Sequence, residues 1–326
     1  MNKQNAPHVI VVGSGPVGTI IGGHLARGGI NISCVDSGER LQIIQQFGYI
    51  VNGKTQLQQP VNYLFESVDR LKDIDCDAIL ICTKTVALNS ILSSLKTHLQ
   101  KKKRPLIMSC QNGLGTEQLI KNVLPDFPVA RMIINFGGCL SPNKKEVTHT
   151  WFNSPNFIAG LDHSGEKILQ HICKALNESG LFTTLVPKEE ILKQAYFKTI
   201  LNASLSPLCT NLELTMQECL TNLAARKMVE QLIDEALQLA NILDLNYGAN
   251  AKKVCMEYLI KGGGHYPSMY EDIKNKRLTE IDFLNGKLLE LSKAHDFAMP
   301  AHQCLTSLIV AKEISFELRE FLPDYL

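Results

Sequence analysis

The turn Gly13-Ser14-Gly15-Pro16-Val17-Gly18 has the residue types and the spacing that bind a dinucleotide. The apolar run His8–Val12 leads into it, a helical pattern follows it, and Asp36 stands 18 positions after Gly18. In such a turn the glycines allow a tight bend, close approach of the backbone to a pyrophosphate, and close contact between helix and strand. The N–H groups that open the helix then bind phosphate. We predict that these six residues contact NAD or NADP, with an incidental tight turn as the alternative.

Asp36 closes the second apolar run, where a carboxylate accepts hydrogen bonds from the adenine ribose of NAD and repels the 2′-phosphate of NADP. Ser37 and Arg40 follow it and offer the opposite chemistry, since a hydroxyl and a guanidinium can hold a phosphate. A plain helix N-cap at Asp36 or Ser37 is the structural alternative. We predict cofactor contacts at all three residues.

Further polar groups come directly after two later apolar runs. Lys84 follows the run 78–83, and Gln111-Asn112-Gly113-Leu114-Gly115-Thr116 follows the run 106–110. The glycines allow a turn close to a ligand, and Asn112 offers both a donor and an acceptor. A surface lysine and an ordinary Asn-Gly turn are the alternatives. We predict Lys84 and Asn112 as cofactor contacts, and Gly138 with them.

In the second half of the chain, Lys198, Asn202 and Ser206 stand at i, i+4 and i+8, which places them on one face of a helix. A polar face of this kind is most often only the solvated side of a helix. Glu280 flanks the apolar stripe of a helix expected over residues 279–295. A partly buried carboxylate near a lysine fixes the geometry of both groups. Ordinary ion pairs on a surface helix are the alternative.

The elements that position these groups change in type along the chain. Short apolar runs alternate with helical stretches in the first part, which is typical of a parallel sheet covered on both faces. Later, helical periodicity dominates. We predict an α/β protein, with a Rossmann-type, doubly wound, mostly parallel sheet over residues 1–186 and an all-helical substrate domain over residues 187–326. The expected strands are 8–12, 31–35, 78–83, 106–110 and 130–135, and the expected helices include 189–205, 222–243 and 279–295.

Composition excludes several classes of partner. The 326 residues carry a net charge of +1, so no overall field attracts nucleic acid or an anionic membrane. The basic run 101–104 is expected to be a solvated loop. Ten cysteines form no C-x-x-C pair and no Cys/His cluster with zinc spacing, so we expect a reduced, cytoplasmic protein with no metal. The expected partner is a small-molecule substrate, and the sequence does not decide whether the protein forms a homodimer.

Several of these residues together resemble the 2-dehydropantoate 2-reductase (ketopantoate reductase) family, from Val9 to about Pro300. The resemblance implies NAD(P)H-dependent reduction of 2-dehydropantoate to pantoate, a step toward pantothenate and coenzyme A. It implies that Lys198 is the general acid, that Lys84, Asn112 and Glu280 act around the cofactor and the reacting carbonyl, and that Asn112, Lys198, Asn202, Asn211 and Ser268 contact the substrate. The residues that carry it are Lys84, the 111–116 motif, Lys198 with Asn202, and Ser268-Met269, Thr279-Glu280-Ile281-Asp282 and Asn285-Gly286.

The chain departs from the family pattern at three places, one of which is a shortened stretch between Ser206 and Asn211. Ser206 stands where members often have a second asparagine; we keep it among the predicted substrate contacts, and its shorter side chain leaves the identity of the 2-oxo acid open. Asp36-Ser37 stands where NADPH-using members often carry a basic residue, so electrostatics favours NADH whereas the resemblance favours NADPH. The alternatives to ketopantoate reduction are a reductase of another 2-oxo acid and a non-catalytic dinucleotide-binding sensor.

Overall fold

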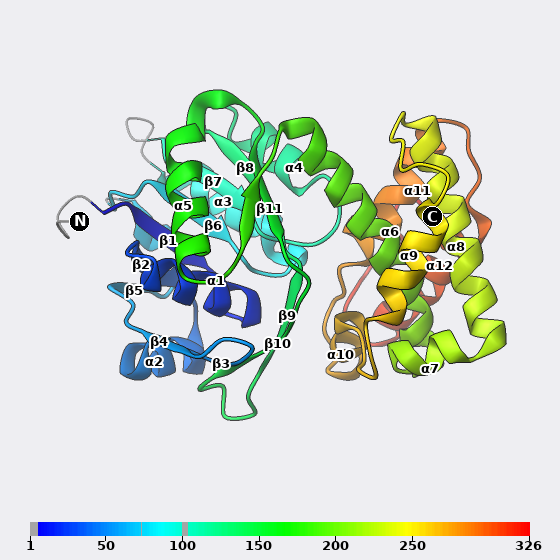
Figure 1. Cartoon of the computed structure of the whole chain (residues 1–326), viewed down its shortest axis with the longest axis horizontal. Helices are drawn as coiled ribbons and strands as arrows, with labels where there is room; N and C mark the ends of the chain where they lie inside the picture. The colour runs from blue at the N-terminus through cyan, green and yellow to red at the C-terminus, as the bar shows by residue number, and fades with distance from the viewer. Residues whose placement is uncertain (1–5, 73, 100–103) are drawn as a thin grey trace. The chain divides into compact units, whose positions relative to one another are not determined.

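The computed structural model describes residues 6–72, 74–99 and 104–326 and divides the chain into two compact units (Figure 1). The first unit consists of Met1–Gln111 and Thr116–Leu192, and the second of Asn112–Gly115 and Lys193–Leu326. The chain passes between them inside helix α6 (Lys188–Leu212). The predicted loop at 101–103 lies outside the described residues.

Among the described residues, the first unit contains an eight-stranded sheet with the strand order β12-β11-β8-β7-β6-β1-β2-β5. Neighbouring strands run parallel, except for the antiparallel pair of β11 and β8. The central strands are buried along almost their whole length because apolar residues point to both faces. The predicted α/β class with a mostly parallel sheet is confirmed. The strands are β1 (His8–Val12), β2 (Asn31–Val35), β5 (Tyr63–Phe65), β6 (Ala78–Ile81), β7 (Leu106–Ser109), β8 (Val129–Ile133), β11 (Asn156–Gly160) and β12 (Thr183–Leu185).

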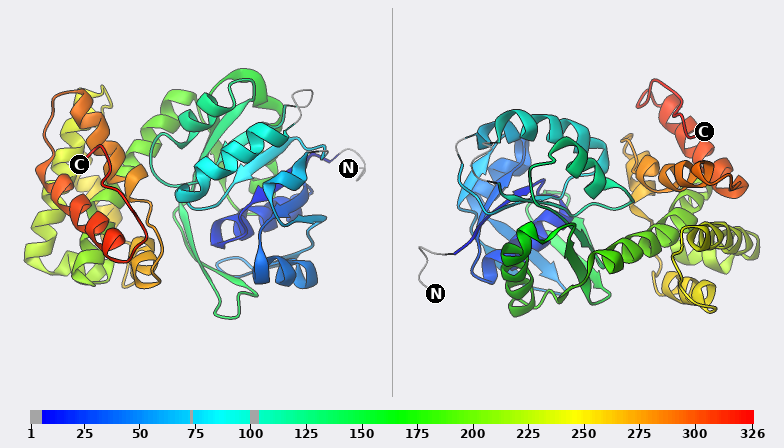
Figure 2. Two further views of the ribbon diagram at one scale, coloured as in Figure 1. Left: turned by 180° about the vertical axis from the view of Figure 1, so that it is seen from behind. Right: turned by 90° about the horizontal axis from the view of Figure 1, so that it is seen from above.

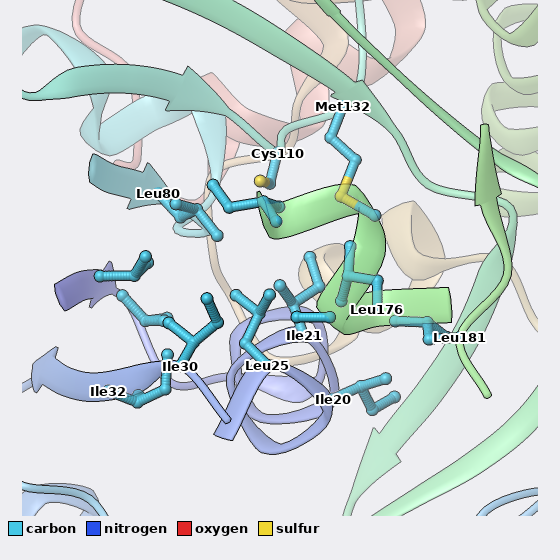
Figure 3. Close-up of a cluster of buried hydrophobic side chains, with 14 of the residues drawn as sticks. Ile20, Ile21, Leu25, Ile30, Ile32, Leu80, Cys110, Met132, Leu176 and Leu181 are labelled. Carbon is cyan, nitrogen blue, oxygen red and sulfur yellow. The ribbon is translucent and has the colours of Figure 1, made fainter. Parts of the chain in front are cut away.

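Helices cover both faces of this sheet (Figures 1 and 2). On one face α1 and α5 pack against each other, and on the other α3 packs against α4. Figure 3 shows the core on the first face, where Ile20, Ile21 and Leu25 of α1 lie among Met132 of β8 and Leu176 of α5. The helices of this unit are α1 (Pro16–Arg27), α2 (Gly38–Phe47), α3 (Leu88–His98), α4 (Thr116–Val123) and α5 (Glu166–Glu178).

A second, four-stranded sheet in the first unit was not predicted. Its strand order is β4-β3-β10-β9, and it packs against α1. Three predicted strands end earlier than expected. The strands predicted over 78–83 and 130–135 end two residues earlier, at Ile81 and Ile133, and the strand predicted over 106–110 ends one residue earlier, at Ser109. The polar groups after them therefore lie in loops. The strands of the second sheet are β3 (Tyr49–Gly53), β4 (Leu57–Gln59), β9 (Phe136–Leu140) and β10 (Val147–Phe152).

The second unit is helical from Lys193 onward, as the periodicity predicted. No described helix in either unit is long and apolar enough to cross a bilayer. Besides most of α6, the unit contains α7 (Met216–Thr221), α8 (Leu223–Ile242), α9 (Ala251–Ile260), α10 (Ser268–Lys274), α11 (Asn285–Ala294) and α12 (Pro300–Ser315).

The helix expected over residues 279–295 begins later, at Asn285. Residues Ile281–Phe283 form a short 3-10 turn, and Leu284 leaves helical geometry with φ −100° and ψ −97°. In a continuous helix, the Phe283 carbonyl would accept a hydrogen bond from the N–H four residues later. It instead accepts from the Leu114 N–H at 2.8 Å. Glu280 therefore lies in an irregular segment before α11, and its predicted place on a helix is wrong.

A buried histidine joins four helices of the second unit. His302 Nδ1 accepts from Asn285 Nδ2, and His302 Nε2 donates to the Leu232 carbonyl, both at 3.0 Å. Asn285 Nδ2 also donates to the Ala203 carbonyl at 3.0 Å. That carbonyl lacks its usual helical donor because Pro207, four residues later in α6, has no N–H. Asn285 thus satisfies the backbone group that the proline leaves open.

We expect the second unit to lose stability in mild acid. Burial lowers the pKa of His302 from 6.5 to about 4, against a smaller opposite effect of the Leu232 hydrogen bond. In the unfolded chain this histidine is protonated near pH 6.5, whereas in the folded protein His302 is protonated only near pH 4. Its stabilising contribution is therefore complete above pH 6.5 and is lost as the pH falls toward 4, by on the order of 3 kcal/mol. Urea unfolding followed by circular dichroism across this pH range measures the loss.

The control is His302→Gln, which keeps an amide at this position but does not titrate. This variant should be less stable at neutral pH and should show a flatter pH dependence than the wild type. Equal slopes in the two proteins would contradict the role of His302.

Candidate functional site

The three glycines of the first turn serve different purposes. Gly13 has φ +91°, and a Cβ there would lie 2.6 Å from Thr83 Cγ2. A Cβ on Gly18 would lie 2.0 Å from the Gly13 carbonyl oxygen. A Cβ on Gly15, the N-cap residue of α1, would meet no atom within 4 Å. Gly13 and Gly18 are therefore required by the fold, whereas Gly15 leaves open space at the end of a helix whose N–H groups face outward.

The centre of the turn is held by side chains of its own unit. Ser14 is fully buried, and its N–H donates to Asp36 Oδ2 at 2.6 Å. Its carbonyl accepts from Arg40 Nε at 3.0 Å and from the Thr19 hydroxyl at 2.9 Å. Its hydroxyl is hydrogen-bonded to the Tyr49 hydroxyl at 2.9 Å. The sequence predicted a cofactor contact at Ser14, but each of its polar groups is engaged by the protein.

Arg40 was expected to face a phosphate, yet its guanidinium is buried beneath the turn. Besides the Ser14 carbonyl, it donates from Nη2 to the Thr19 hydroxyl at 2.8 Å and from Nη1 to the Lys144 carbonyl in the β9–β10 connection. Ser37, in contrast, is exposed as the N-cap residue of α2. Arg40 therefore stabilises the turn from the protein interior, because its guanidinium donates hydrogen bonds to carbonyl and hydroxyl oxygens of the protein.

Asp36 connects the end of β2 to the turn. One carboxylate oxygen accepts from the Ser14 N–H and the other from the Ser37 N–H, at 2.6 and 2.7 Å. The side chain is half-buried. A carboxylate has about four lone-pair sites, so these two hydrogen bonds leave acceptor capacity for hydroxyl groups of a ligand.

Lys84 and Gly138 occupy unlike places in the first unit. Lys84 is exposed and caps the 3-10 turn Thr85–Ala87, and its carbonyl accepts from Gln111 Nε2 at 3.2 Å. Gly138 lies on β9, where a Cβ would come within 2.9 Å of Ile20 Cδ1. The smallness of Gly138 therefore serves the packing of α1.

A buried ion pair behind the 111–116 motif was missed by the sequence analysis. Arg131 of β8 pairs with Glu117, donates to the Thr116 hydroxyl at 3.0 Å and donates to the Gln111 carbonyl at 3.4 Å. It therefore holds both ends of the Asn112–Gly115 segment. The available signal was an arginine inside an apolar strand, since a buried charge requires a partner.

The Asn112–Gly115 segment itself groups with the helical unit. The Leu114 N–H donates to the Phe283 carbonyl, and Gly113 has φ +85° with no room for a Cβ, which would lie 2.3 Å from the same oxygen. Asn112 Nδ2 donates to Glu280 Oε2 at 3.3 Å. The structure thus brings Asn112 and Glu280 together, although they are far apart in the sequence.

Helix α6 carries the predicted polar stripe on a face that stays half exposed. Between Ala195 and Thr210, its half-buried residues are Phe197, Lys198, Asn202 and Ser206, and the other residues of this stretch are buried. Three polar residues therefore share the half-exposed face of this stretch, whose other faces are buried. Asn285, five residues after Glu280, binds the Ala203 carbonyl and so joins the Glu280 segment to α6 beside Asn202.

The remaining predicted substrate residues lie at the ends of helices. Asn211 is half-buried, and its Nδ2 donates to the Pro207 carbonyl of its own helix at 2.9 Å. Ser268 is exposed and begins α10. Within the described part of the chain, no group of three or more His, Cys, Asp or Glu residues can hold a metal ion.

Both halves of the chain match one protein family. Residues 9–157 match the family described as ketopantoate reductase PanE/ApbA, and residues 190–313 match its C-terminal part. The 2-dehydropantoate 2-reductase of Pyrococcus horikoshii is 25% identical over 306 residues, which cover 94% of this chain and 97% of that protein.

Solved structures of similar fold include two kinds of protein. A PanE/ApbA family ketopantoate reductase from Ralstonia eutropha JMP134 superposes with a TM-score of 0.82 at 19% identity, over 95% of this chain and 99% of that one. A D-mandelate dehydrogenase in a ternary structure with NADH and anilino(oxo)acetate has a TM-score of 0.79 at 25% identity, over 96% of this chain and 100% of that one. With the matches to both halves, these findings show that the chain belongs to the ketopantoate reductase PanE/ApbA family of NAD(P)H-dependent 2-oxo acid reductases.

Proposed function

We propose that the protein reduces 2-dehydropantoate (ketopantoate) to pantoate, with Lys198 as the general acid. The observation that carries the proposal is the half-exposed stripe of Lys198, Asn202 and Ser206 on α6, in a stretch between Ala195 and Thr210 whose other residues, apart from Phe197, are buried. The same unit holds the hydrogen-bonded pair of Asn112 and Glu280. An ammonium and amide groups in one unit can donate to the ketone and carboxylate oxygens of a 2-oxo acid, and a carboxylate beside them can accept from a substrate hydroxyl or orient the ammonium.

When bound, the reduced nicotinamide supplies a hydride for the ketone carbon of the substrate. Lys198 holds its ammonium group at the ketone oxygen and gives this oxygen a proton as negative charge develops on it. Asn202 and Ser268 hold the hydroxyl and carboxylate groups of the substrate, and Ser206 and Asn211 complete its surroundings. Glu280, fixed in part by Asn112, orients Lys198 or the substrate.

The first unit fits a dinucleotide, and its charges favour NADH. The open space at Gly15 lets a pyrophosphate approach the backbone at the start of α1. Asp36 presents a carboxylate where the adenine ribose is expected, and a 2′-phosphate there would be repelled. Arg40 cannot offset this repulsion without giving up its buried hydrogen bonds to Ser14 and Thr19.

Removing the charge of Asp36 is expected to weaken the preference for NADH. Asp36→Asn keeps an oxygen that can accept from the Ser14 N–H, but it no longer repels a 2′-phosphate. The ratio of kcat/KM for NADH to that for NADPH should fall by about 10-fold, since hydrogen bonds to charged groups contribute about 1.5–3 kcal/mol. Glu39→Gln, which neutralises a nearby exposed acid paired with Lys144, is the control and should leave the ratio unchanged. A wild-type protein that strongly prefers NADPH would refute this reading of Asp36.

Reduction of a different 2-oxo acid is the second candidate. Ser206 has a shorter side chain than the asparagine often found there, and the D-mandelate dehydrogenase relative is 25% identical. Its named substrate bears a phenyl ring, whereas ketopantoate bears a branched hydroxyalkyl group.

The deciding experiment follows the nicotinamide absorbance of NADH and NADPH with ketopantoate and with a panel of aliphatic and aromatic 2-oxo acids. Highest kcat/KM with ketopantoate supports the proposal, and highest kcat/KM with an aromatic acid supports the second candidate. Tight dinucleotide binding without oxidation by any acid in the panel would indicate a sensor and would overturn both.

A further inference from the structure

The 316–326 segment folds back onto the residues that flank Glu280. Arg319 Nη2 donates to both oxygens of Asp282, at 2.9 and 3.1 Å. The Tyr325 hydroxyl donates to Asp282 Oδ1. Burial and the negative charge of Asp282 raise the pKa of Tyr325, so its phenol stays protonated and acts as a donor. Asp282 is therefore bound by two residues from beyond α12.

Thr279, on the N-terminal side of Glu280, is also bound by the C-terminal part of the chain. Glu313, at the end of α12, is fully buried, and its Oε1 accepts from the Thr279 N–H at 2.8 Å and the Thr279 hydroxyl at 2.7 Å. Its Oε2 accepts from Arg319 Nε at 2.9 Å. A buried carboxylate is costly without a cation, and Arg319 supplies one. One guanidinium thus connects the residues on both sides of Glu280.

A third contact fixes the end of the segment. A Cβ on Gly286 would fall 2.7 Å from Cε1 and Cζ of Tyr325, so the tyrosine ring lies directly against the start of α11. Lys293 Nζ, about two turns further along α11, donates to the Asp324 carbonyl at 3.3 Å. The 316–326 segment is therefore seated along α11 as well as on the loop before it.

From these contacts we infer that Arg319 and Tyr325 are positioning residues for Glu280. They act by holding Thr279 (through Glu313) and Asp282, between which Glu280 stands. Both lie beyond residue 313, where the match to the family ends. The inference rests on the proposed role of Glu280 in the reduction.

Arg319→Met tests it, because methionine keeps much of the side-chain volume and removes the donors. We expect kcat for the best 2-oxo acid to fall by about 10- to 100-fold, since small misplacements of an active-site group cost rates of this order. The dinucleotide Kd should stay within about twofold of wild type. Arg319→Lys, which keeps the charge, should recover part of the loss, and Tyr325→Phe, which keeps the ring on Gly286, should show a smaller loss of the same kind.

A double-mutant cycle separates positioning from general stability. In a Glu280→Gln background, Arg319→Met should lower kcat by less than about twofold, because the group it positions is already disabled. Arg226→Met, which removes an exposed arginine paired with Glu230, is the matched control and should leave kcat unchanged in both backgrounds. An unchanged kcat in Arg319→Met, or an equal loss with and without Glu280→Gln, overturns the inference. If Arg319→Met does not fold, the same cycle with Tyr325→Phe decides.

Hydrogen exchange distinguishes this inference from the proposed function. Arg319→Met should speed amide exchange over residues 279–286 and leave α8 unchanged. If the wild type reduces no 2-oxo acid, the proposed function and the catalytic part of the inference fall together. Faster exchange confined to 279–286 would then still support the structural part, and unchanged exchange there would overturn it.

Discussion

Replacing Lys198 with alanine is expected to lower kcat for 2-oxo acid reduction by roughly 10²- to 10⁴-fold, the usual contribution of a general acid. The reason is that the ketone oxygen gains a full negative charge as hydride arrives, and no proton donor of equal strength stands on the same face of α6. Asn202 and Ser206, its neighbours on that face, can hydrogen-bond the oxygen but cannot neutralise it. Steady-state kinetics with saturating dinucleotide and substrate measure the loss.

Dinucleotide affinity should change little in this variant, because Lys198 belongs to the helical unit and the glycine turn to the other. Lys227→Ala, which removes an exposed lysine of α8, is the matched control and should keep full activity. An unchanged turnover of Lys198→Ala would remove Lys198 from the chemistry. A raised Kd for NADH with unchanged kcat would instead assign it to cofactor binding.

Two alanine substitutions in the glycine turn are expected to differ in effect: Gly15→Ala should impair dinucleotide binding, and Gly18→Ala should impair stability. Gly15→Ala should fold with a free energy of unfolding within about 1 kcal/mol of wild type, because the new methyl group meets no protein atom. It should nevertheless weaken dinucleotide binding by about 5- to 150-fold, the equivalent of about 1–3 kcal/mol of steric overlap, since the methyl fills the space left for the pyrophosphate.

Gly18→Ala should instead lower the melting temperature strongly, because its Cβ would lie 2.0 Å from the Gly13 carbonyl oxygen. Thermal unfolding and calorimetric titration with NADH, carried out on both variants, separate the two roles. Wild-type affinity in Gly15→Ala would show that the open space beside α1 is not where the dinucleotide phosphates bind.

Much of the fold was predictable because its signals are local. The apolar runs at 8–12 and 31–35 became β1 and β2 with the expected bounds, since a strand buried on both faces must be apolar along its length. The α6 stripe was predictable as well, because positions i, i+4 and i+8 share a face in any helix. The second sheet was not predicted, since β9 and β10 contain glycines and polar residues and are buried through pairing with each other and packing against α1.

Parts of the site could not be predicted because they depend on residues far apart in the sequence. The sequence predicted Arg40 as a cofactor contact, and only the folded chain places its guanidinium against the Ser14 carbonyl. The continuous helix predicted at 279–295 failed because Leu114 and Glu313 bind backbone groups at its start. No periodicity in one segment reports on a partner more than 30 residues away, as with Thr279 and Glu313.

The sequence by itself determined the parallel sheet, the glycine turn with its acid, and the polar face of α6, because each follows from the repeat of a single element or from one short turn. The tertiary structure alone decided which polar groups are already engaged and which stay open to a ligand. In the folded chain Ser14 is hydrogen-bonded to four side chains, space remains at Gly15, and Asn112 donates to Glu280. These outcomes depend on packing between distant elements, where a buried polar group must find a partner that only the folded chain provides.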